Sequence, residues 1–195
     1  MAVMLPMGAS AQNTSLLNRL YDTFASDCVI LDCTYTISAS GITSKGECQV
    51  QIQGTAYIMS GSGLEIFCDG ETVWILDSAA KEAVIEPVSD DAMSYMTNPA
   101  LLFKDMDKVF TMAGSFQTSE GTRYQLKAND ACGIKNAVLH IGNDAALRDA
   151  EFTLDDDSVI KIQVSSEKVS ALKPIENFRP ASFSSEWIVT DFRDF

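Results

Sequence analysis

The residue types that carry out most enzymatic chemistry are scarce in this sequence. His140 is the only histidine, and it falls within the alternating pattern Val138-Leu139-His140-Ile141, which predicts a surface residue of a strand rather than a general base. The sequence contains no Gly-x-Ser-x-Gly elbow, phosphate-binding glycine loop or dinucleotide fingerprint. We therefore predict that the protein is not an enzyme, while leaving open whether carboxylates on different strands converge in space.

Groups that could hold a metal or a cofactor do not follow any known spacing. Asp155-Asp156-Asp157 begins like a calcium loop, but no glycine stands at the sixth position and no glutamate at the twelfth. The cysteines fit no zinc pattern, and their odd number would leave at least one thiol unpaired in an oxidising compartment. We expect no metal and no cofactor, and the sequence leaves the cysteine pairing open. The five cysteines are Cys28, Cys33, Cys48, Cys68 and Cys132.

The charge balance argues against nucleic acid as a partner. Fourteen basic and twenty-seven acidic residues give a formal net charge of −13, which repels polyphosphate unless a local basic patch intervenes. Lysines and arginines are spread along the chain and form no run.

A chain of 195 residues can bury about 70% of its unfolded surface as one domain.

The first residues have the composition of a secretory leader. A short apolar stretch ends at Ala9-Ser10-Ala11, a small-x-small pattern typical of signal-peptidase cleavage. We expect residues 1–11 to be the remnant of a signal peptide and residues 12–195 to form a single exported domain. A chance apolar terminus is the alternative, because no positive charge precedes the stretch. Gln12 stands where a lipoprotein would carry its acylated cysteine, so the protein is not expected to be a lipoprotein itself.

The periodicity of apolar residues predicts a mainly β fold. Residues 16–24 show helical spacing behind an N-cap at Asn13 or Thr14, and Asp69-Gly70 is the favoured pair for a hairpin turn. Two short helices are expected around Asn98-Pro99, and an irregular arm ending in one strand is expected after residue 173. Together these elements predict one strongly curved sheet or incomplete barrel whose open side is covered by helices. Strands, about ten in all, are expected within 29–38, 48–53, 56–59, 64–68, 72–76, 81–86, 109–116, 122–127, 137–141, 151–154 and 159–164.

One block of sequence resembles a known family. Asp69-Gly70-Glu71-Thr72-Val73-Trp74-Ile75-Leu76-Asp77, followed by Lys81-Glu82-Ala83-Val84-Ile85, is similar to the periplasmic outer-membrane lipoprotein carrier family, LolA. The segment Asn98-Pro99-Ala100-Leu101-Leu102-Phe103 lies at the expected distance, and the chain ends in a phenylalanine-rich arm. The resemblance implies a half-open, strongly curved antiparallel β-barrel covered by short α-helices.

The resemblance also implies a function. Members of this family are periplasmic chaperones that take the acyl chains of lipoproteins from an inner-membrane lipoprotein-releasing transporter and pass them to an outer-membrane acceptor. We expect such a carrier here, acting as a monomer. The candidate wall of the lipid-binding cavity is Tyr35, Ile66, Trp74 and Leu76. The candidate lid is Met93, Met96, Leu101, Leu102 and Phe103, since flexible methionines suit variable apolar ligands; the alternative is a helix pair packed permanently on the sheet.

The chain departs from the family at one motif. Better-known relatives have a Pro-x-x-Phe-x-Trp segment with a nearby arginine that latches the lid, whereas this chain has Met59-Ser60-Gly61-Ser62-Gly63-Leu64. The departure allows a second hypothesis, a periplasmic binding or sensing module for another lipid or amphiphile without a delivery role. A lipid hydrolase is disfavoured because the sequence offers no nucleophile and base.

Overall fold

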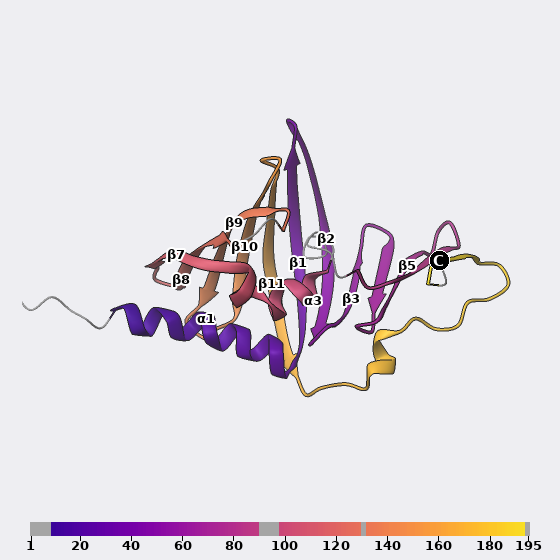
Figure 1. The fold of residues 1–195 in the computed structure, drawn as a ribbon, viewed down its shortest axis with the longest axis horizontal. Helices are drawn as coiled ribbons and strands as arrows, with labels where there is room; N and C mark the ends of the chain where they lie inside the picture. The colour runs from indigo at the N-terminus through magenta and orange to yellow at the C-terminus, as the bar shows by residue number, and fades with distance from the viewer. Residues whose placement is uncertain (1–8, 90–97, 130–131, 194–195) are drawn as a thin grey trace, which may run out of the picture.

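The computed structural model describes residues 9–89, 98–129 and 132–193, with only the backbone of residues 9–15 and 101. Most of these residues are in strands, and the few helices are short apart from the first (Figure 1). None of the helices in this part of the chain combines the length and hydropathy that crossing a bilayer requires. The elements are α1 (Ala9–Ser26), β1 (Cys28–Ala39), β2 (Ile42–Gln53), β3 (Ala56–Gly61), β4 (Leu64–Cys68), β5 (Thr72–Asp77), β6 (Glu82–Pro87), α3 (Pro99–Lys104), α4 (Met106–Val109), β7 (Phe110–Gln117), β8 (Gly121–Ala128), β9 (Ile134–Gly142), β10 (Leu147–Leu154), β11 (Val159–Ser170), η1 (Ile175–Phe178) and β12 (Ile188–Asp191).

The described strands form one sheet in the order β12-β6-β5-β4-β3-β2-β1-β11-β10-β9-β8-β7. Neighbours are antiparallel except β12, which runs parallel to β6. The long strand β1 joins the two halves of the chain, because it pairs with β2 on one side and with β11 on the other. Bulges interrupt several ladders, including the β1–β11 ladder between Asp32 and Cys33, and bulges increase the local twist of a sheet. The predicted mainly β fold with one strongly curved sheet and few helices is confirmed.

The predicted hairpin at Asp69-Gly70 is also confirmed. β4 and β5 pair antiparallel, with Cys68 opposite Val73. Between them, Asp69 Oδ1 accepts hydrogen bonds from the backbone N–H groups of Glu71 (3.0 Å) and Thr72 (2.9 Å), which is the local bonding that makes aspartate a turn residue. Gly70 has a φ of +96°, a conformation that favours glycine. The turn therefore sets the register of this hairpin.

The helices cover one face of the sheet (Figure 1). Leu17, Leu20 and Phe24 of α1 are buried in the main core, and the ring of Phe24 stacks on Phe103 of α3 with centroids 4.1 Å apart. The helix begins at Ala9, so the N-cap predicted at Asn13 or Thr14 is wrong; no residue between Ala9 and Thr14 is a glycine or proline that would stop the helix earlier. The α1–α3 contact fixes α3 over the sheet.

The C-terminal arm crosses the opposite face of the sheet. Phe178 of η1 is fully buried against Cys28, Ala56 and Ile58. Arg179 Nε donates to Asp69 Oδ2 at 2.7 Å, which ties the arm to the β4–β5 turn. The arm ends in β12 at the edge of the sheet, as predicted for the tail.

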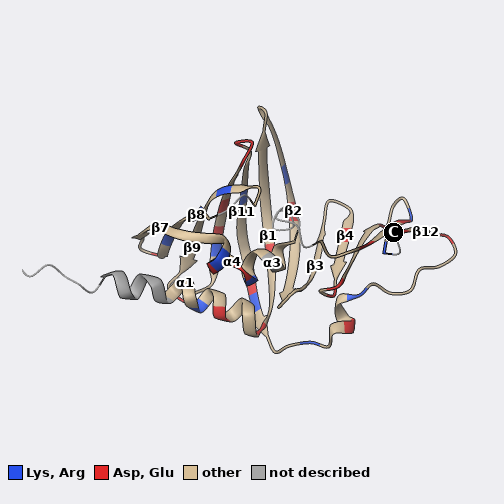
Figure 2. Cartoon of the chain, viewed as in Figure 1, with Lys and Arg blue, Asp and Glu red and all other residues tan. Residues whose placement is uncertain are grey.

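In Figure 2, basic and acidic residues are interspersed over the elements in view.

The stacking of α1 on α3 leads to a stability prediction. Phe24→Ala removes a side chain that is 1% exposed, so we expect it to lower the free energy of unfolding by about 3–5 kcal/mol. The measurement is urea denaturation followed by circular dichroism. Arg19→Ala, on the exposed side of the same helix, should change stability by less than about 0.5 kcal/mol. Equal effects of the two substitutions would contradict the packing.

The Asp69–Arg179 ion pair leads to a prediction about pH. Burial alone would raise the pKa of Asp69, but the N–H groups of Thr72 and Glu71 and the Arg179 guanidinium hold the pKa below its usual value. A lowered carboxyl pKa stabilises the folded state above the unfolded pKa, and this contribution is lost as the pH falls below about 4. The difference in the free energy of unfolding between wild type and Arg179→Gln should therefore be largest at neutral pH and shrink in acid. Urea unfolding at a series of pH values from neutral to below about 4 measures it. A difference that is constant with pH would contradict the assignment.

Candidate functional site

A cavity of about 400 Å³ lies between the concave face of the sheet and α3. Every described residue that lines it is uncharged, and hydroxyl groups come only from Tyr35 and Ser62. Seven strands, α3 and the β3–β4 turn contribute to the wall. The lining residues are Leu31, Cys33, Tyr35, Ile37, Cys48, Val50, Ile52, Met59, Gly61, Ser62, Leu64, Ile66, Pro99, Leu102, Phe103, Ile134, Leu147, Ala150, Phe152, Leu154, Ile160 and Ile162.

The alternation of strand residues explains why these side chains share one face. Successive residues of a strand point to opposite faces of the sheet, and the lining residues of β1 occupy every second position from Leu31 to Ile37. Directly opposite residues of antiparallel neighbours point to the same face, so Leu31 and its partner Val50 both face the cavity. The same alternation on β10 brings Ala150, Phe152 and Leu154 inward.

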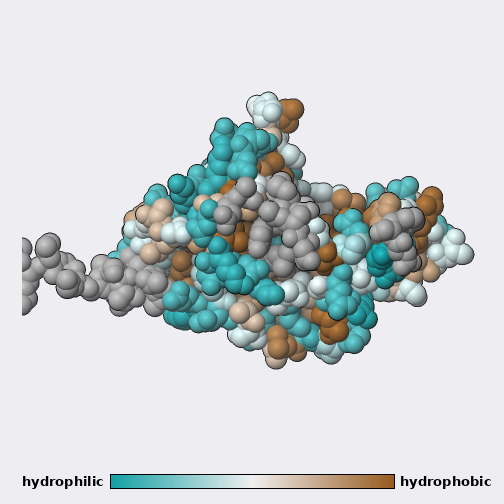
Figure 3. All heavy atoms as spheres, viewed as in Figure 1, coloured by the Kyte–Doolittle hydropathy of each residue, from teal (hydrophilic) through white to brown (hydrophobic). Residues whose placement is uncertain are grey.

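The cavity is closed at one end and open at the other. Ile52, Leu147 and Leu31 are 1%, 2% and 3% exposed, whereas Ile37 and Leu64 are 38% and 42% exposed. The exposed lining residues lie toward the β1–β2 and β3–β4 turns, so we define this end as the mouth. Ile42 at the tip of the β1–β2 hairpin is 74% exposed, and hydrophobic atoms are visible at the tip of this hairpin in Figure 3.

The two hydroxyl groups of the cavity bond to each other near the mouth. The Tyr35 hydroxyl lies 2.7 Å from Ser62 Oγ, which joins β1 to the β3–β4 turn. Gly46, the partner of Tyr35 on β2, makes room for the ring, because a Cβ atom at position 46 would collide with the Tyr35 hydroxyl end. The pair satisfies these polar groups and leaves the rest of the wall apolar.

The short helix α3 closes part of the cavity. Asn98 Oδ1 accepts a hydrogen bond from the Ala100 backbone N–H at 3.0 Å, and Pro99 occupies the first helical position, where its missing N–H costs nothing. Leu102 and Phe103 line the cavity and are 7% and 9% exposed, so in this structure they are packed against the sheet.

The structure brings together some of the predicted site residues. Tyr35, Ile66, Leu102 and Phe103 line the cavity. Met93 and Met96 lie outside the described residues, and Leu101 is described only by its backbone, within α3. The assignment of the α3 region as a lid remains a prediction.

Trp74 and Leu76 do not line the cavity, and their assignment to its wall is corrected. In the β4–β5 ladder, Ile66 faces Ile75, whereas Trp74 faces Phe67 and Leu76 faces Glu65. Trp74 and Leu76 therefore point to the face opposite that of Ile66. The Asp69-Gly70 turn carried enough information to find this, because counting outward from it gives the register. Sequence reasoning also missed Cys33, although period two places it on the same face as the predicted Tyr35. It missed Cys48 and the β10 and β11 wall because their position depends on pairing between strands.

His140 is buried, at 7% exposure, so its prediction as a surface residue is wrong. Its Nδ1 atom lies 2.9 Å from Asp149 Oδ2, and Asp149 also pairs with Arg123 at 3.2 Å. Thr118 Oγ1 lies 3.5 Å from His140 Nε2 and donates to the Gly121 carbonyl at 3.2 Å, within the β7–β8 turn. Neither described cavity includes these side chains. The chain of contacts ties β8, β9 and β10 together on the outer face.

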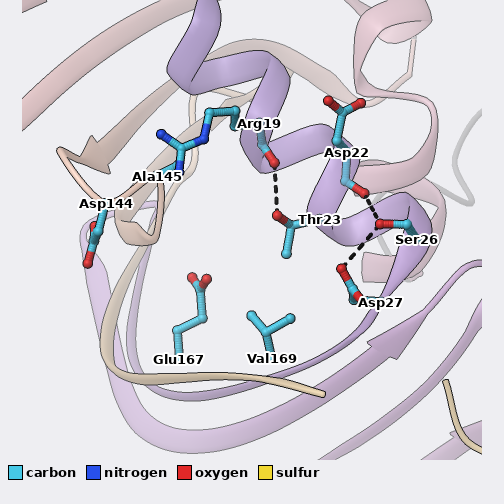
Figure 4. A pocket seen from close by; sticks show the side chains of 9 residues that line it. All are labelled: Arg19, Asp22, Thr23, Ser26, Asp27, Asp144, Ala145, Glu167 and Val169. Atoms are coloured by element: carbon cyan, nitrogen blue, oxygen red, sulfur yellow. Dashed lines mark hydrogen bonds between the residues drawn. The ribbon is translucent and has the colours of Figure 1, made fainter. Parts of the chain in front are cut away.

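A second hollow of about 330 Å³ lies between α1, the β9–β10 turn and β11, and it is polar. Figure 4 shows carboxylates of Asp22, Asp27, Asp144 and Glu167 around it. Burial raises the pKa of Glu167, whose Oε2 accepts a hydrogen bond from the Leu147 backbone N–H at 2.8 Å. Among the described residues, no three potential ligands come together as a metal site.

Comparisons with known proteins identify the fold. No protein-family model matches the chain, and no curated protein matches it either. An uncharacterized conserved protein from Thermus thermophilus is 13% identical, with a TM-score of 0.58 over 94% of this chain and 99% of that chain. This similarity shows a shared fold.

Two further solved structures score lower. A LolA superfamily protein from Nitrosomonas europaea is 13% identical, with a TM-score of 0.47 over 86% of this chain and 97% of that chain. A DUF1329 family protein from Desulfovibrio piger is 9% identical, with a TM-score of 0.49 over 89% and 98%. The fold expected from the resemblance, an open curved sheet with helices over one face, is confirmed by the structure of the chain itself.

The contact between Tyr35 and Ser62 can be measured by a double-mutant cycle. Because the pair is partly exposed, we expect Tyr35→Phe and Ser62→Ala to show a coupling of about 0.5–1 kcal/mol in the free energy of unfolding. The control cycle combines Tyr35→Phe with Ser60→Ala, since Ser60 faces Glu65 on the other side of the sheet. That cycle should be additive within about 0.3–0.5 kcal/mol. Additivity in both cycles would contradict the hydrogen bond.

Proposed function

We propose that the protein is a non-enzymatic periplasmic carrier that binds the acyl chains of lipoproteins in the cavity. In this proposal it receives them from an inner-membrane releasing transporter and delivers them to an outer-membrane acceptor. The observation that carries the proposal is that every described residue lining the cavity is uncharged. An acyl chain has no hydrogen-bond donors or acceptors, so its burial against this wall leaves no polar group of the wall without a hydrogen-bond partner.

The energetics of acyl chains support a container of this kind. Each methylene moved out of water contributes about 0.8 kcal/mol, so a chain of about sixteen carbons leaves roughly 12 kcal/mol to be gained by burial. A volume of about 400 Å³ lies within the range of ligand pockets, roughly 300–1,000 Å³. The Tyr35–Ser62 pair lies near the mouth, where the polar end of a bound chain would leave the cavity.

The charge of the protein supports a carrier that leaves membranes. A formal net charge of −13 is repelled by anionic lipid head groups, which favours release of the loaded protein into water.

The Cys33 and Cys48 thiols are the other weakly polar groups of the wall, and thiols behave largely as small hydrophobes.

One observation favours the second hypothesis, a binding or sensing module for another amphiphile. Where better-known relatives place a latching arginine, Met59, Gly61, Ser62 and Leu64 line the cavity themselves. The Tyr35–Ser62 hydroxyl contact includes Ser62 of this segment. A neutral hydrogen bond is weaker than a charge-assisted one, so this contact would latch a lid less strongly than an arginine would.

The binding proposal is tested by filling the cavity. Ala150 is 2% exposed and lines the cavity, so Ala150→Leu should displace ligand volume and weaken binding of a fluorescent fatty-acid probe by about tenfold or more. The matched control is Thr153→Leu on the same strand, which adds bulk on the opposite face. Equal affinities of the two variants and wild type would contradict binding in this cavity.

Delivery is tested separately from binding. The full chain is exported to a bacterial periplasm, purified without detergent and analysed by native mass spectrometry. A one-to-one complex with acylated lipoprotein that passes its cargo to acceptor-bearing vesicles would support the carrier. Binding of acyl probes together with failure to bind or transfer lipoprotein would replace the carrier with the amphiphile-binding module.

A further inference from the structure

Two of the five cysteines face each other across the central hairpin. Cys33 of β1 and Cys48 of β2 are direct partners in the antiparallel ladder, and both line the cavity. Each thiol is the main influence on the pKa of the other, and neither is in a disulfide in this structure.

The backbone geometry suits a covalent link between them. Directly opposite residues of antiparallel strands have Cα atoms about 4.5–5.5 Å apart, and disulfides span about 4.4–6.8 Å between Cα atoms. Both side chains point to the same face, so a link needs only side-chain rotation and small strand shifts. The bulge beside Cys33 in the β1–β11 ladder gives β1 some freedom to adjust its twist.

The remaining cysteines have no such partner among the described residues. Cys28 lies opposite Ser170, Cys68 lies opposite Tyr57 and Val73, and the Cys132 thiol donates to the Ile134 carbonyl. All three are buried.

We propose that Cys33 and Cys48 form a redox-active dithiol in the cavity wall, which low-molecular-weight disulfides convert into a cross-strand disulfide. This site goes beyond the acyl-binding function and does not depend on it. Its substrate class is a low-molecular-weight disulfide, for which oxidised glutathione is the probe, and the partly exposed Cys48 is the point of attack.

The two thiols have different parts in the reaction. The neighbouring Cys33 thiol lowers the pKa of Cys48, while the Cys48 thiol and burial raise the pKa of Cys33. Cys48 is also the more exposed of the two. The Cys48 thiolate attacks one sulfur of oxidised glutathione, forming a mixed disulfide and releasing one glutathione thiolate.

Cys33 then completes the exchange. It loses its proton, its thiolate attacks the Cys48 sulfur of the mixed disulfide, and the second glutathione leaves. The protein has lost two electrons and two protons, and one glutathione disulfide has become two glutathione thiols.

The test is equilibration of the full, folded chain with oxidised and reduced glutathione over a series of ratios. Samples are quenched with acid, free thiols are counted after alkylation, and linked peptides are mapped by mass spectrometry. We expect the thiol count to fall from five to three, with one link between positions 33 and 48. A full count of five under fully oxidising ratios, or a link between any other pair, would overturn the proposal.

Single variants assign the parts of the two thiols. Cys33→Ala should stop at a glutathione adduct on Cys48, and Cys48→Ala should leave Cys33 unreacted. Cys132→Ala, which removes a thiol outside the β1–β2 ladder, should still form the 33–48 link at the wild-type ratio. A Cys48→Ala protein that forms the adduct on Cys33 as fast as Cys33→Ala forms it on Cys48 would contradict the assigned order. Circular dichroism checks that each variant is folded, and the wild-type peptide map tests the link even if a variant is not.

Discussion

The structure depends on how one continuous sheet buries its concave face. Twisted strands that stay paired along the whole order from β12 to β7 curl toward one side, and apolar residues collect there because strands alternate. The inward side chains leave a space of about 400 Å³ unfilled. The helices α1, α3 and α4 pack into the core on this side, and the stacking of Phe24 on Phe103 joins α1 to α3.

The polar groups are distributed so that the cavity stays apolar. The Tyr35 and Ser62 hydroxyl groups form a hydrogen bond near its mouth. The buried His140 forms one with Asp149 on the outer face. Unpaired polar groups in the wall would favour water over an acyl chain, since burying them costs about 1–3 kcal/mol each. The proposed acyl-binding function rests on this separation.

The C-terminal arm packs on the outer face of the sheet. Phe178 fills a position against Cys28, Ala56 and Ile58, and Arg179 reaches back to the Asp69 turn. The arm spans strands that are far apart in sequence, so it links the turn of β4 and β5 to the end of β11.

The sequence by itself determined the features that depend on neighbouring residues. Alternation predicted the strands, the Asp69-Gly70 pair predicted a hairpin that the register confirms, and the tail was predicted as an arm ending in one strand. Only the tertiary structure decided which face of each strand points inward. Period two divides residues into two sets without saying which set is inside. The hairpin register shows that Ile66 and Trp74 lie on opposite faces, but only the tertiary structure shows that the face of Ile66 is the inner one. The burial of His140 and the meeting of Cys33 with Cys48 were also decided there, because both depend on pairing between strands whose register no short stretch of sequence encodes.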